Sequence, residues 1–514
     1  MADVVVVGAG LGGLAAAARL AAAGHRVTVC EQSGTVGGKL GWFSRDGFGF
    51  DTGPSLLTLP AVYRDLFAAT GHTALEDHVD LEPVDPAFDY RFADGTRLEL
   101  PNLSRSGTRA AMDAALGAGA GDQWLALMRR AARIWDVTRE PFLTSPLQGP
   151  RTLARLSRRT GDLRTVAPWL SLRSLGRRYL DDPHLRTLLD RYATYTGSDP
   201  RRAPAALATV PYMEQRFGSW YVRGGLRRLA EAVHDRAVAS GALVRTHADV
   251  VALVVEDGRA AGVRLADGAV LPADVVVSDA DATALYRDLV PDAVPARRRA
   301  LAGLRRVTPS LSGFVLLLAL RGRTPGLRHH TVLFGADYDA EFDAVFGVGR
   351  RRGAPRPVAD PTVYVAVPDD PATRPDDDSE AWFVLVNAPR HVPDDPRAGI
   401  DWDAPGLADR YADQVLQVMA SRGLDVRDRV LWREVRTPAD LERDTRSVGG
   451  SIYGTSSNGP RAAFLRPANA SPLPGLYLVG GSAHPGGGIP LVGLSAQIVA
   501  DLLGRAGSPS TARR

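Results

Sequence analysis

The most regular pattern near the start of the chain is a run of four valines that ends in glycines and passes into an alanine-rich segment. The stretch DVVVVGAGLGGLAAAARLAAAGHRVTVCEQ begins at Asp3, and its valines do not alternate with polar residues. An uninterrupted β-branched run of this kind is typical of a strand buried in a parallel sheet. The alanine-rich part predicts a helix and RVTVCE a second strand, so the pattern predicts strand, glycine turn, helix and strand.

Three glycines lie where the first strand must turn into the helix. Gly8, Gly10 and Gly13 fit the spacing G-x-G-x-x-G. At such a turn the first glycine permits a tight bend, the second lets a pyrophosphate approach the backbone, and the third packs the helix against the strand. The start of the helix at Leu11 and Gly12 then presents free N–H groups and the positive dipole end to the phosphates. The spacing and its context predict a dinucleotide site.

A carboxylate and a second glycine turn follow. Glu31 closes the second strand, where an acid binds the adenosine ribose hydroxyls, so it favours FAD or NAD over NADP. Gly37 and Gly38 precede Lys39, and a glycine turn with a cation would bracket the same pyrophosphate; a solvated surface charge is the alternative for Lys39. Because no second G-x-G-x-x-G follows a strand, one nucleotide site with extra glycine contacts favours a tightly held flavin.

The same order of elements returns near the other end of the chain. Residues 475–503, GLYLVGGSAHPGGGIPLVGLSAQIVADLL, contain a strand-like run, a glycine-rich turn and a helix-like run. The longest apolar run, FVLLLAL at 314–320, is far shorter than the roughly 20 residues of a membrane-spanning helix. Since a strand begins by residue 3, we expect no signal peptide. The expected location is cytoplasmic, peripheral on the inner face of the cell membrane.

Composition narrows the class of protein. A length of 514 residues predicts two or more domains, or one large core with insertions. The 62 basic residues are 61 arginines and Lys39, a bias that indicates GC-rich coding, and the formal net charge is only +4, so we expect no nucleic-acid partner. The single cysteine, Cys30, excludes an intramolecular disulfide and any cysteine-rich metal site. His329-His330 has no further ligands in the pattern, and we expect no metal.

Several separate stretches resemble the FAD-dependent carotenoid desaturases of the bacterial phytoene desaturase type, within the flavin amine oxidase-like superfamily. The N-terminal stretch and FDTGPSLLTLP resemble that family's N-terminal signature, and YATYTGSDPRRAPAALATVPYMEQRFGSWYVRGGLRRLAEAV its central segment. GGSIYGTSSNGPRAAFLRP and the glycine-rich turn resemble its C-terminal flavin signature. The likeness covers nearly the whole chain.

The resemblance implies an α/β fold with a Rossmann-like FAD-binding domain into which an α+β substrate domain is inserted. The FAD-binding domain would be discontinuous, made of residues 1–75, 215–295 and 445–514. Residues 80–210 and 300–440 would form the substrate and membrane-associated domain. In relatives of this type, a strand that corresponds to the one at Val250 pairs its backbone with the adenine.

The resemblance also assigns the C-terminal turn to the flavin. Gly480, Gly481 and Ser482 would end the strand beside the ribityl chain. The start of the last helix, including Pro490, Leu491 and Val492, would lead amides toward the pyrimidine side of the flavin, where they stabilise negative charge. His484 is the candidate catalytic residue, because a histidine near flavin can orient substrate or accept a proton. A turn histidine bonded to the backbone is the alternative.

The implied reaction is dehydrogenation of an acyclic carotenoid by hydride transfer to FAD, with reoxidation by oxygen or a quinone. RYATYTG and GGSAHPGGGIP are closer to the hydroxycarotenoid 3,4-desaturases, and similar proteins include diapocarotenoid desaturases and terminal-methyl oxygenases. Two other classes share the fold. Amine oxidases usually place a lysine near flavin N5, whereas the only lysine here adjoins Gly38; Rab GDP-dissociation inhibitors carry prenyl groups without flavin chemistry.

Two charged stretches remain. Arg151–Arg178 contains eight arginines and one acid, interleaved with leucines and Trp169, which suits an interfacial helix on anionic lipid. An exposed basic helix face is the alternative, and an apolar substrate favours membrane contact. The acidic stretch DDPATRPDDDSE at 369–380 predicts a solvated loop.

Overall fold

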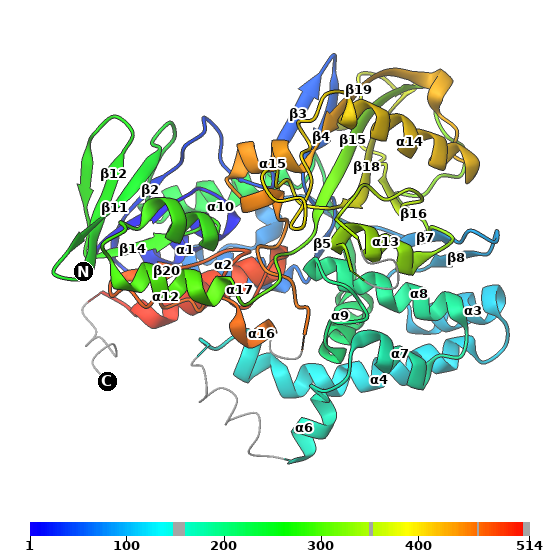
Figure 1. Ribbon diagram of the computed structural model, residues 1–514, viewed down its shortest axis with the longest axis horizontal. Coiled ribbons are helices and arrows are strands. Elements are labelled where there is room, and N and C mark those ends of the chain that lie inside the picture. Colours follow the sequence, from blue (N-terminus) through cyan, green and yellow to red (C-terminus); the bar gives the residue numbers. More distant parts are fainter. Residues whose placement is uncertain (148–159, 349–352, 460–461, 507–514) are drawn as a thin grey trace.

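The structure is a computed structural model that describes residues 1–147, 160–348, 353–459 and 462–506. Figure 1 shows a parallel sheet with its helices on the left, and a larger sheet above a group of helices on the right. The two parts are joined by several crossings of the chain rather than by one linker, because each part contains segments of several separate colours.

A parallel sheet of five strands lies at the centre of the left part. Every neighbouring pair in it is parallel, and the order is β10 (Leu243–Arg245), β2 (Arg26–Cys30), β1 (Asp3–Val7), β14 (Val275–Ser278) and β20 (Leu476–Leu478). The valine run is central, because Val5 lies between Thr28 of β2 and Val276 of β14. Distant parts of the chain thus meet in one Rossmann-like sheet, which confirms the predicted fold class.

Both faces of this sheet are covered, as the uninterrupted valine run predicts. Val4 and Val6 pack into a helical core, whereas Val5 and Val7 pack on the opposite side. The helices on the first side are α1 (Leu11–Ala22), α2 (Ala61–Gly71), α10 (Arg227–Ala239) and α17 (Ile489–Leu503). The other side is covered by a small antiparallel sheet with α11 (Ala282–Ala284) and α12 (Pro295–Leu304).

That antiparallel sheet has a tight two-residue turn between its first two strands. Its strands, in order, are β11 (Val250–Glu256), β12 (Arg259–Leu265) and β13 (Val270–Pro272). Asp257 and Gly258 join the first pair with φ of 47° and 74°. Positive φ at both central residues matches the twist of the flanking strands, which explains the aspartate–glycine pair.

A mixed sheet of seven strands dominates the right part. Its order is β19 (Val430–Arg436), β15 (Ser312–Arg321), β18 (Ser379–Ala388), β17 (Val363–Ala366), β16 (His330–Leu333), β7 (Phe88–Arg91) and β8 (Arg97–Leu100). The longest apolar run lies in the interior strand β15. Leu316 and Leu318 face the core beneath α14 (Leu407–Ser421), and Val315 and Leu317 face the opposite side. No helix in the described ranges is long and apolar enough to cross a bilayer.

Short strands and helices complete the structure. One hydrophobic core is shared by strands β7, β8 and β16 and a group of helices. These helices are α3 (Arg105–Leu116), α4 (Ala120–Thr138), α7 (Leu172–Tyr179), α8 (Pro183–Arg191), α9 (Thr209–Phe217) and α13 (Tyr338–Phe346). The small strands are β3 (Trp42–Arg45) with β4 (Phe48–Asp51), and β5 (Leu57–Thr58), β9 (Ser219–Val222) and β6 (Leu81–Pro83). Within the described ranges, the remaining α-helices are α6 (Thr160–Val166), α15 (Pro438–Thr445) and α16 (Ala462–Leu465).

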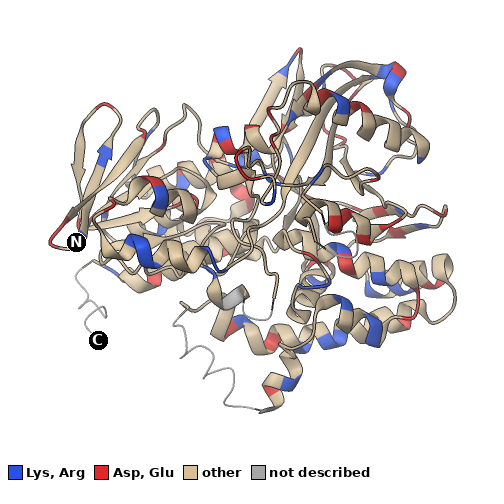
Figure 2. Cartoon of the chain, viewed as in Figure 1, with Lys and Arg blue, Asp and Glu red and all other residues tan. Residues whose placement is uncertain are grey.

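The arginine-rich segment is only partly available for lipid contact. Its residues 151–159 lie outside the described part of the chain. Leu172 and Leu175 are buried in the helical core, whereas Trp169 is 62% exposed. Figure 2 shows basic and acidic residues together on these helices. Leu172 and Leu175 therefore serve the core, and among the described residues of this segment Trp169 is an exposed large apolar group.

The acidic stretch at 369–380 differs from the predicted solvated loop at two of its acids. Asp370 is 3% exposed and accepts hydrogen bonds from Tyr221 Oη at 2.9 Å and Gly224 N at 2.6 Å. Glu380 is 4% exposed, lies in β18 and pairs with Arg429 at 3.0 Å. The prediction is wrong for these two, because each carboxylate is compensated by donors far away in the sequence.

We expect Gly13→Ala to destabilise the protein by roughly 1–3 kcal/mol. A Cβ at Gly13 would lie 2.2 Å from the carbonyl oxygen of Gly8, so β1 and α1 would have to move apart. Urea unfolding measures the change. The matched control is Gly303→Ala in α12, where an added Cβ meets no atom within 4 Å, and which should be neutral or stabilising by up to about 1 kcal/mol. Equal losses in the two variants would contradict the packing argument.

Candidate functional site

A cavity of about 720 Å³ lies between the parallel sheet and the seven-stranded sheet. Its wall includes the ends of β1 and β2, at Val7 and Cys30, and Asp279 immediately after β14. In open parallel sheets, ligands bind beyond the carboxyl ends of the strands. The position of the cavity therefore makes it the candidate site.

The glycine loop after β1 forms one end of the cavity. Gly8 has a φ of 95°, and Gly10 caps the start of α1 without a side-chain hydrogen bond. Gly37 donates its N–H to Ala9 O at 2.8 Å and forms a backbone bridge with Gly10, so the second glycine turn closes against the first. Uncapped N–H groups at a helix start favour an anion such as phosphate.

Two of the predicted glycines lie behind the wall and not in it. Gly13 packs against Gly8, as described above, and Gly480 has a φ of 87°. A Cβ at Gly12 would lie 2.9 Å from the Cα of Gly480. These positions bring the first and the last crossover of the chain into backbone contact, and so they position the glycine loop.

Glu31 reaches the cavity directly after β2. Its Oε2 accepts a hydrogen bond from Ala9 N at 2.8 Å, and its Oε1 accepts from Ser33 N and Ser33 Oγ, both at 2.9 Å. The side chain is 8% exposed and lines the wall. Three donors fix the carboxylate at the edge of the sheet, where it can still accept from a ligand hydroxyl.

Lys39 lies in the wall next to Gly38, and it is not a solvated charge. Its Nζ donates to Ser451 O at 3.0 Å and to Ile452 O at 2.8 Å. Burial lowers the pKa of Lys39 to about 8, and the nearby carboxyls of Asp281 and Asp279 oppose that shift. The ammonium group thus ties the N-terminal loop to the C-terminal part of the chain and brings positive charge to the cavity.

Two carboxyls that the sequence analysis did not single out lie beside the glycine loop, the partly buried Asp279 and the buried Asp281. Burial raises the pKa of Asp279 to about 7, and it also raises the pKa of Asp281. Asp281 accepts hydrogen bonds from the N–H groups of Thr283 and Ala284, at 2.8 and 3.2 Å. The available signal was SDAD directly after a valine run, because acids at the end of a parallel strand meet the other strand ends.

The other predicted residues divide between the wall and the core. Val250, the first residue of β11, is buried and lines the cavity. Ser482 lines it as well, and its Oγ accepts a hydrogen bond from Ala282 N at 2.9 Å. Leu491 packs into the helical core instead. The predicted residues that the structure brings together in the wall are Gly8, Gly10, Leu11, Gly12, Glu31, Gly38, Lys39, Val250, Gly481, Ser482, Pro490 and Val492.

His484 does not line the cavity. Its Nε2 donates to Phe142 O at 2.7 Å and to Ser145 O at 3.1 Å, and its ring packs edge-on against Phe142. Burial lowers the pKa of His484 to about 4, so the imidazole is neutral near pH 7. This arrangement favours the alternative of a turn histidine bonded to the backbone.

The end of the cavity away from the glycine loop is mostly apolar. Strands of the seven-stranded sheet and neighbouring loops contribute its side chains, among them Leu56, Phe88, Val315, Val332, Phe383 and Leu385. The glycine loop together with Glu31 and Lys39 forms what we call the glycine cradle. This glycine cradle and the apolar wall border one continuous cavity. A site of this kind suits a large apolar ligand held against a nucleotide cofactor.

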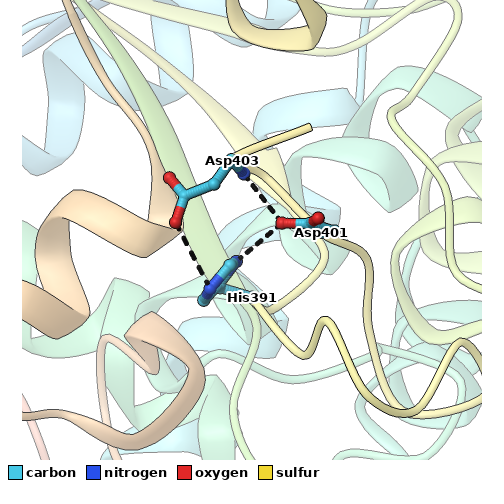
Figure 3. Close-up of side chains that lie close together, drawn as sticks. All are labelled: His391, Asp401 and Asp403. Carbon is cyan, nitrogen blue, oxygen red and sulfur yellow. Dashed lines mark hydrogen bonds and ion pairs between the residues drawn. The ribbon is translucent and has the colours of Figure 1, made fainter. Parts of the chain in front are cut away.

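A cluster of His391, Asp401 and Asp403 lies outside the cavity (Figure 3). Nδ1 of His391 accepts a hydrogen bond from Trp402 N at 3.2 Å, and Asp401 accepts one from Asp403 N at 3.0 Å. Asp403 also pairs with Arg443 at 2.9 Å. Each group thus has a partner within the protein, and these contacts account for the cluster as an anchor of the loop before α14.

We expect Asp279→Asn to stabilise the apo-protein relative to the wild type as pH rises. The Asp279 carboxyl titrates near 3.8 in the unfolded chain and near 7 when folded, so the unfolded chain releases this proton first. The wild type therefore loses stability between these pH values, and the asparagine variant does not. The difference should grow by roughly 2–3 kcal/mol between pH 5 and pH 8, measured by urea unfolding. Asp257→Asn, in an exposed turn, is the control and should show no such growth.

We expect His484→Ala to lower stability by roughly 2–4 kcal/mol, because it removes a buried ring and its hydrogen bond. The rate of carotenoid dehydrogenation per bound flavin should stay within about twofold of the wild-type rate, since the ring does not reach the cavity. Thermal unfolding and a flavin-normalised assay measure the two quantities. Unchanged stability with a large loss of turnover would instead support the catalytic role.

Comparison with known proteins agrees with this geometry. Residues 11–341 match the family described as flavin containing amine oxidoreductase. The chain is 35% identical over 505 residues to a 4,4'-diapolycopene oxygenase of Methylomonas sp, with 97% of each chain covered. It is 36% identical over 529 residues to a hydroxyneurosporene desaturase of Rubrivivax gelatinosus, with 99% of this chain and 95% of that protein covered. A solved oxidoreductase from Methanosarcina mazei shares the fold, with a TM-score of 0.61, 18% identity, and 97% and 99% of the two chains covered. The chain therefore belongs to the flavin-containing amine oxidoreductase family, and within it to the carotenoid desaturases and oxygenases.

Proposed function

We propose that this protein is an FAD-dependent desaturase that removes two hydrogens from adjacent carbons of an acyclic carotenoid. The observation that carries the proposal is that the glycine cradle and the apolar wall line the same cavity. A polyene has no polar handle along its chain, so an enzyme must position it by shape and apolar contact. The full-length similarity to a carotenoid desaturase and a carotenoid oxygenase supports the substrate class.

The residues of the cradle fit FAD. The uncapped start of α1 suits a pyrophosphate, and the fixed carboxylate of Glu31 suits ribose hydroxyls. We propose that the cofactor is held by Gly8, Gly10, Leu11, Gly12, Gly13, Glu31, Gly38, Lys39, Val250, Gly480, Gly481, Ser482, Pro490, Leu491 and Val492. These residues belong to the proposed FAD-binding segments 1–75, 215–295 and 445–514, with 80–210 and 300–440 as the substrate domain.

When bound, FAD supplies the acceptor for a hydride from a carbon–hydrogen bond that no carbonyl activates. The chain contributes position and electrostatics. The start of α17 directs its positive dipole end toward the cavity at Ile489, and Lys39 adds a full positive charge. Both favour negative charge in the cradle, and the apolar wall keeps water from the reacting carbons.

Two narrower activities are supported by the names of relatives. A hydroxyneurosporene desaturase at 36% identity supports a hydroxycarotenoid 3,4-desaturase. A 4,4'-diapolycopene oxygenase at 35% identity supports oxidation of a terminal methyl group. A non-catalytic isoprenoid carrier of the same fold would need no flavin cradle, so the uncapped glycine loop disfavours it.

We further propose that the protein meets the inner face of the cell membrane, in which its substrate dissolves, and that oxygen or a quinone reoxidises the flavin. Trp169 is exposed, and Arg177 and Arg178 of α7 are exposed nearby in the sequence. An aromatic group beside arginines suits the surface of an anionic bilayer.

The experiment mixes FAD-loaded protein with liposomes that contain phytoene, lycopene or a 1-hydroxy acyclic carotenoid, without oxygen. We expect loss of flavin absorption together with a red shift of the polyene, and sedimentation of the protein with anionic liposomes. Gly10→Val is the control: a Cβ there would lie 2.4 Å from Asp279 Oδ2, so the variant should retain no flavin and show no bleaching. If no polyene reduces the flavin of the wild type, the desaturase proposal fails and the oxygenase and carrier functions gain support.

A further inference from the structure

The apolar part of the cavity contains a buried guanidinium. Arg191, the last residue of α8, is 7% exposed and lies in the cavity wall. Its guanidinium carbon lies 5.0, 5.6 and 5.3 Å from the ring centroids of Phe88, Tyr90 and Tyr195. A cation in such surroundings costs free energy unless its donors find partners. Aromatic faces stabilise the charge but leave the N–H groups without acceptors.

Within the described residues, Arg191 has one hydrogen bond, from Nη1 to Tyr195 Oη at 3.2 Å, and no carboxylate within ion-pair distance. A guanidinium has five N–H donors, so most of them have no protein acceptor. Tyr338, also in the wall, has a buried hydroxyl with no hydrogen-bond partner in the same described ranges. The N–H donors of Arg191 that have no protein acceptor are therefore available to a ligand at this largely apolar end of the cavity.

The charge of Arg191 is balanced through a hydroxyl relay. Tyr195 Oη donates to Glu214 Oε2 at 3.0 Å, and Tyr192 Oη donates to Glu214 Oε1 at 2.6 Å. Burial raises the pKa of Glu214, and the two hydroxyls and Arg191 oppose that shift. Because both carboxylate oxygens accept hydrogen bonds, Glu214 is satisfied as an anion, and the cation and the anion together are neutral.

This balance decides which ligand suits the free donors. An anionic group would leave a net negative charge in a water-poor cavity, which is costly. A hydrocarbon would leave the donors unpaired. A neutral oxygen, in a hydroxyl or carbonyl group, accepts from Arg191 without changing the net charge.

We infer that Arg191, which Tyr195 holds in place, binds a neutral oxygen function on the carotenoid, so that the preferred substrate is an oxygenated acyclic polyene. The inference rests on the proposed function, because it assumes that a carotenoid occupies the cavity. Arg191 is then a residue that determines specificity, and it acts on substrate binding. A site built to donate to an oxygen rejects the analogue that lacks it.

The experiment compares lycopene with its 1-hydroxy derivative in liposomes, and measures kcat/KM for anaerobic flavin reduction. For wild-type protein loaded with FAD we expect the hydroxylated polyene to be preferred by at least about tenfold, mainly through a lower KM. Arg191→Met should reduce that ratio by about tenfold, and Tyr195→Phe by a few fold. The matched control is Arg216→Met, an exposed arginine near the Phe217 ring outside the cavity, which should keep the wild-type ratio.

A wild-type ratio near or below one would overturn the inference, as would an Arg191→Met ratio equal to that of the wild type. A quinone carbonyl offers the same chemistry, so reoxidation by a quinone is measured in parallel. Slower reoxidation of Arg191→Met with an unchanged substrate ratio would assign the donors to the acceptor and also overturn it. If Arg191→Met retains no flavin, the inference is tested by the substrate ratio of the wild type and by that of Tyr195→Phe. Reduction by neither polyene contradicts the proposed function, whereas equal reduction by both overturns this inference alone.

Discussion

Close approach of the backbone at the carboxyl edge of the parallel sheet constrains the rest of the structure. Gly13 faces the carbonyl of Gly8, and Gly12 faces the Cα of Gly480, with no room for a side chain between them. A loop near residue 10 and a turn near residue 480 must therefore meet before the cavity can exist. The chain between these two turns therefore leaves this edge of the sheet and returns to it. Its strands between residues 88 and 436 form the seven-stranded sheet, which is the second wall of the cavity.

The two ends of the cavity differ in electrostatic character, and that difference follows from where chain segments converge. Strand ends and helix starts meet at the glycine loop, so dipoles, Lys39 and the carboxyls of Asp279 and Asp281 gather there. The seven-stranded sheet contributes side chains from strand interiors, which are apolar because both faces of β15 are buried. A redox cofactor and a hydrocarbon need these opposite surroundings within one enclosure, and Arg191 is the charged exception at the apolar end.

Sequence reasoning succeeded where a feature depends on neighbours along the chain. The valine run, the glycine turn that follows it at Gly8 and the helix that starts at Ile489 are local patterns with a fixed physical meaning. Reasoning failed where a partner comes from far away. Asp370 is buried because Tyr221 and Gly224 donate to it, and His484 turns from the cavity because it bonds to the carbonyls of Phe142 and Ser145. Composition and periodicity contain no information about such pairings. Asp279 is a different case, because the acids directly after a valine run were a local signal for it.

Lys39 has a consequence beyond binding. It is the only lysine of the chain, and its ammonium group lies in the cavity wall, bonded to the carbonyls of Ser451 and Ile452. Apart from the chain's N-terminus, reagents that modify primary amines thus have a single target, and that target lies in the proposed cofactor site. Amine reagents label most proteins at many surface lysines, but here they probe one position in the cavity wall. The reactivity of Lys39 also reports whether its hydrogen bonds to the carbonyls of Ser451 and Ile452 are formed.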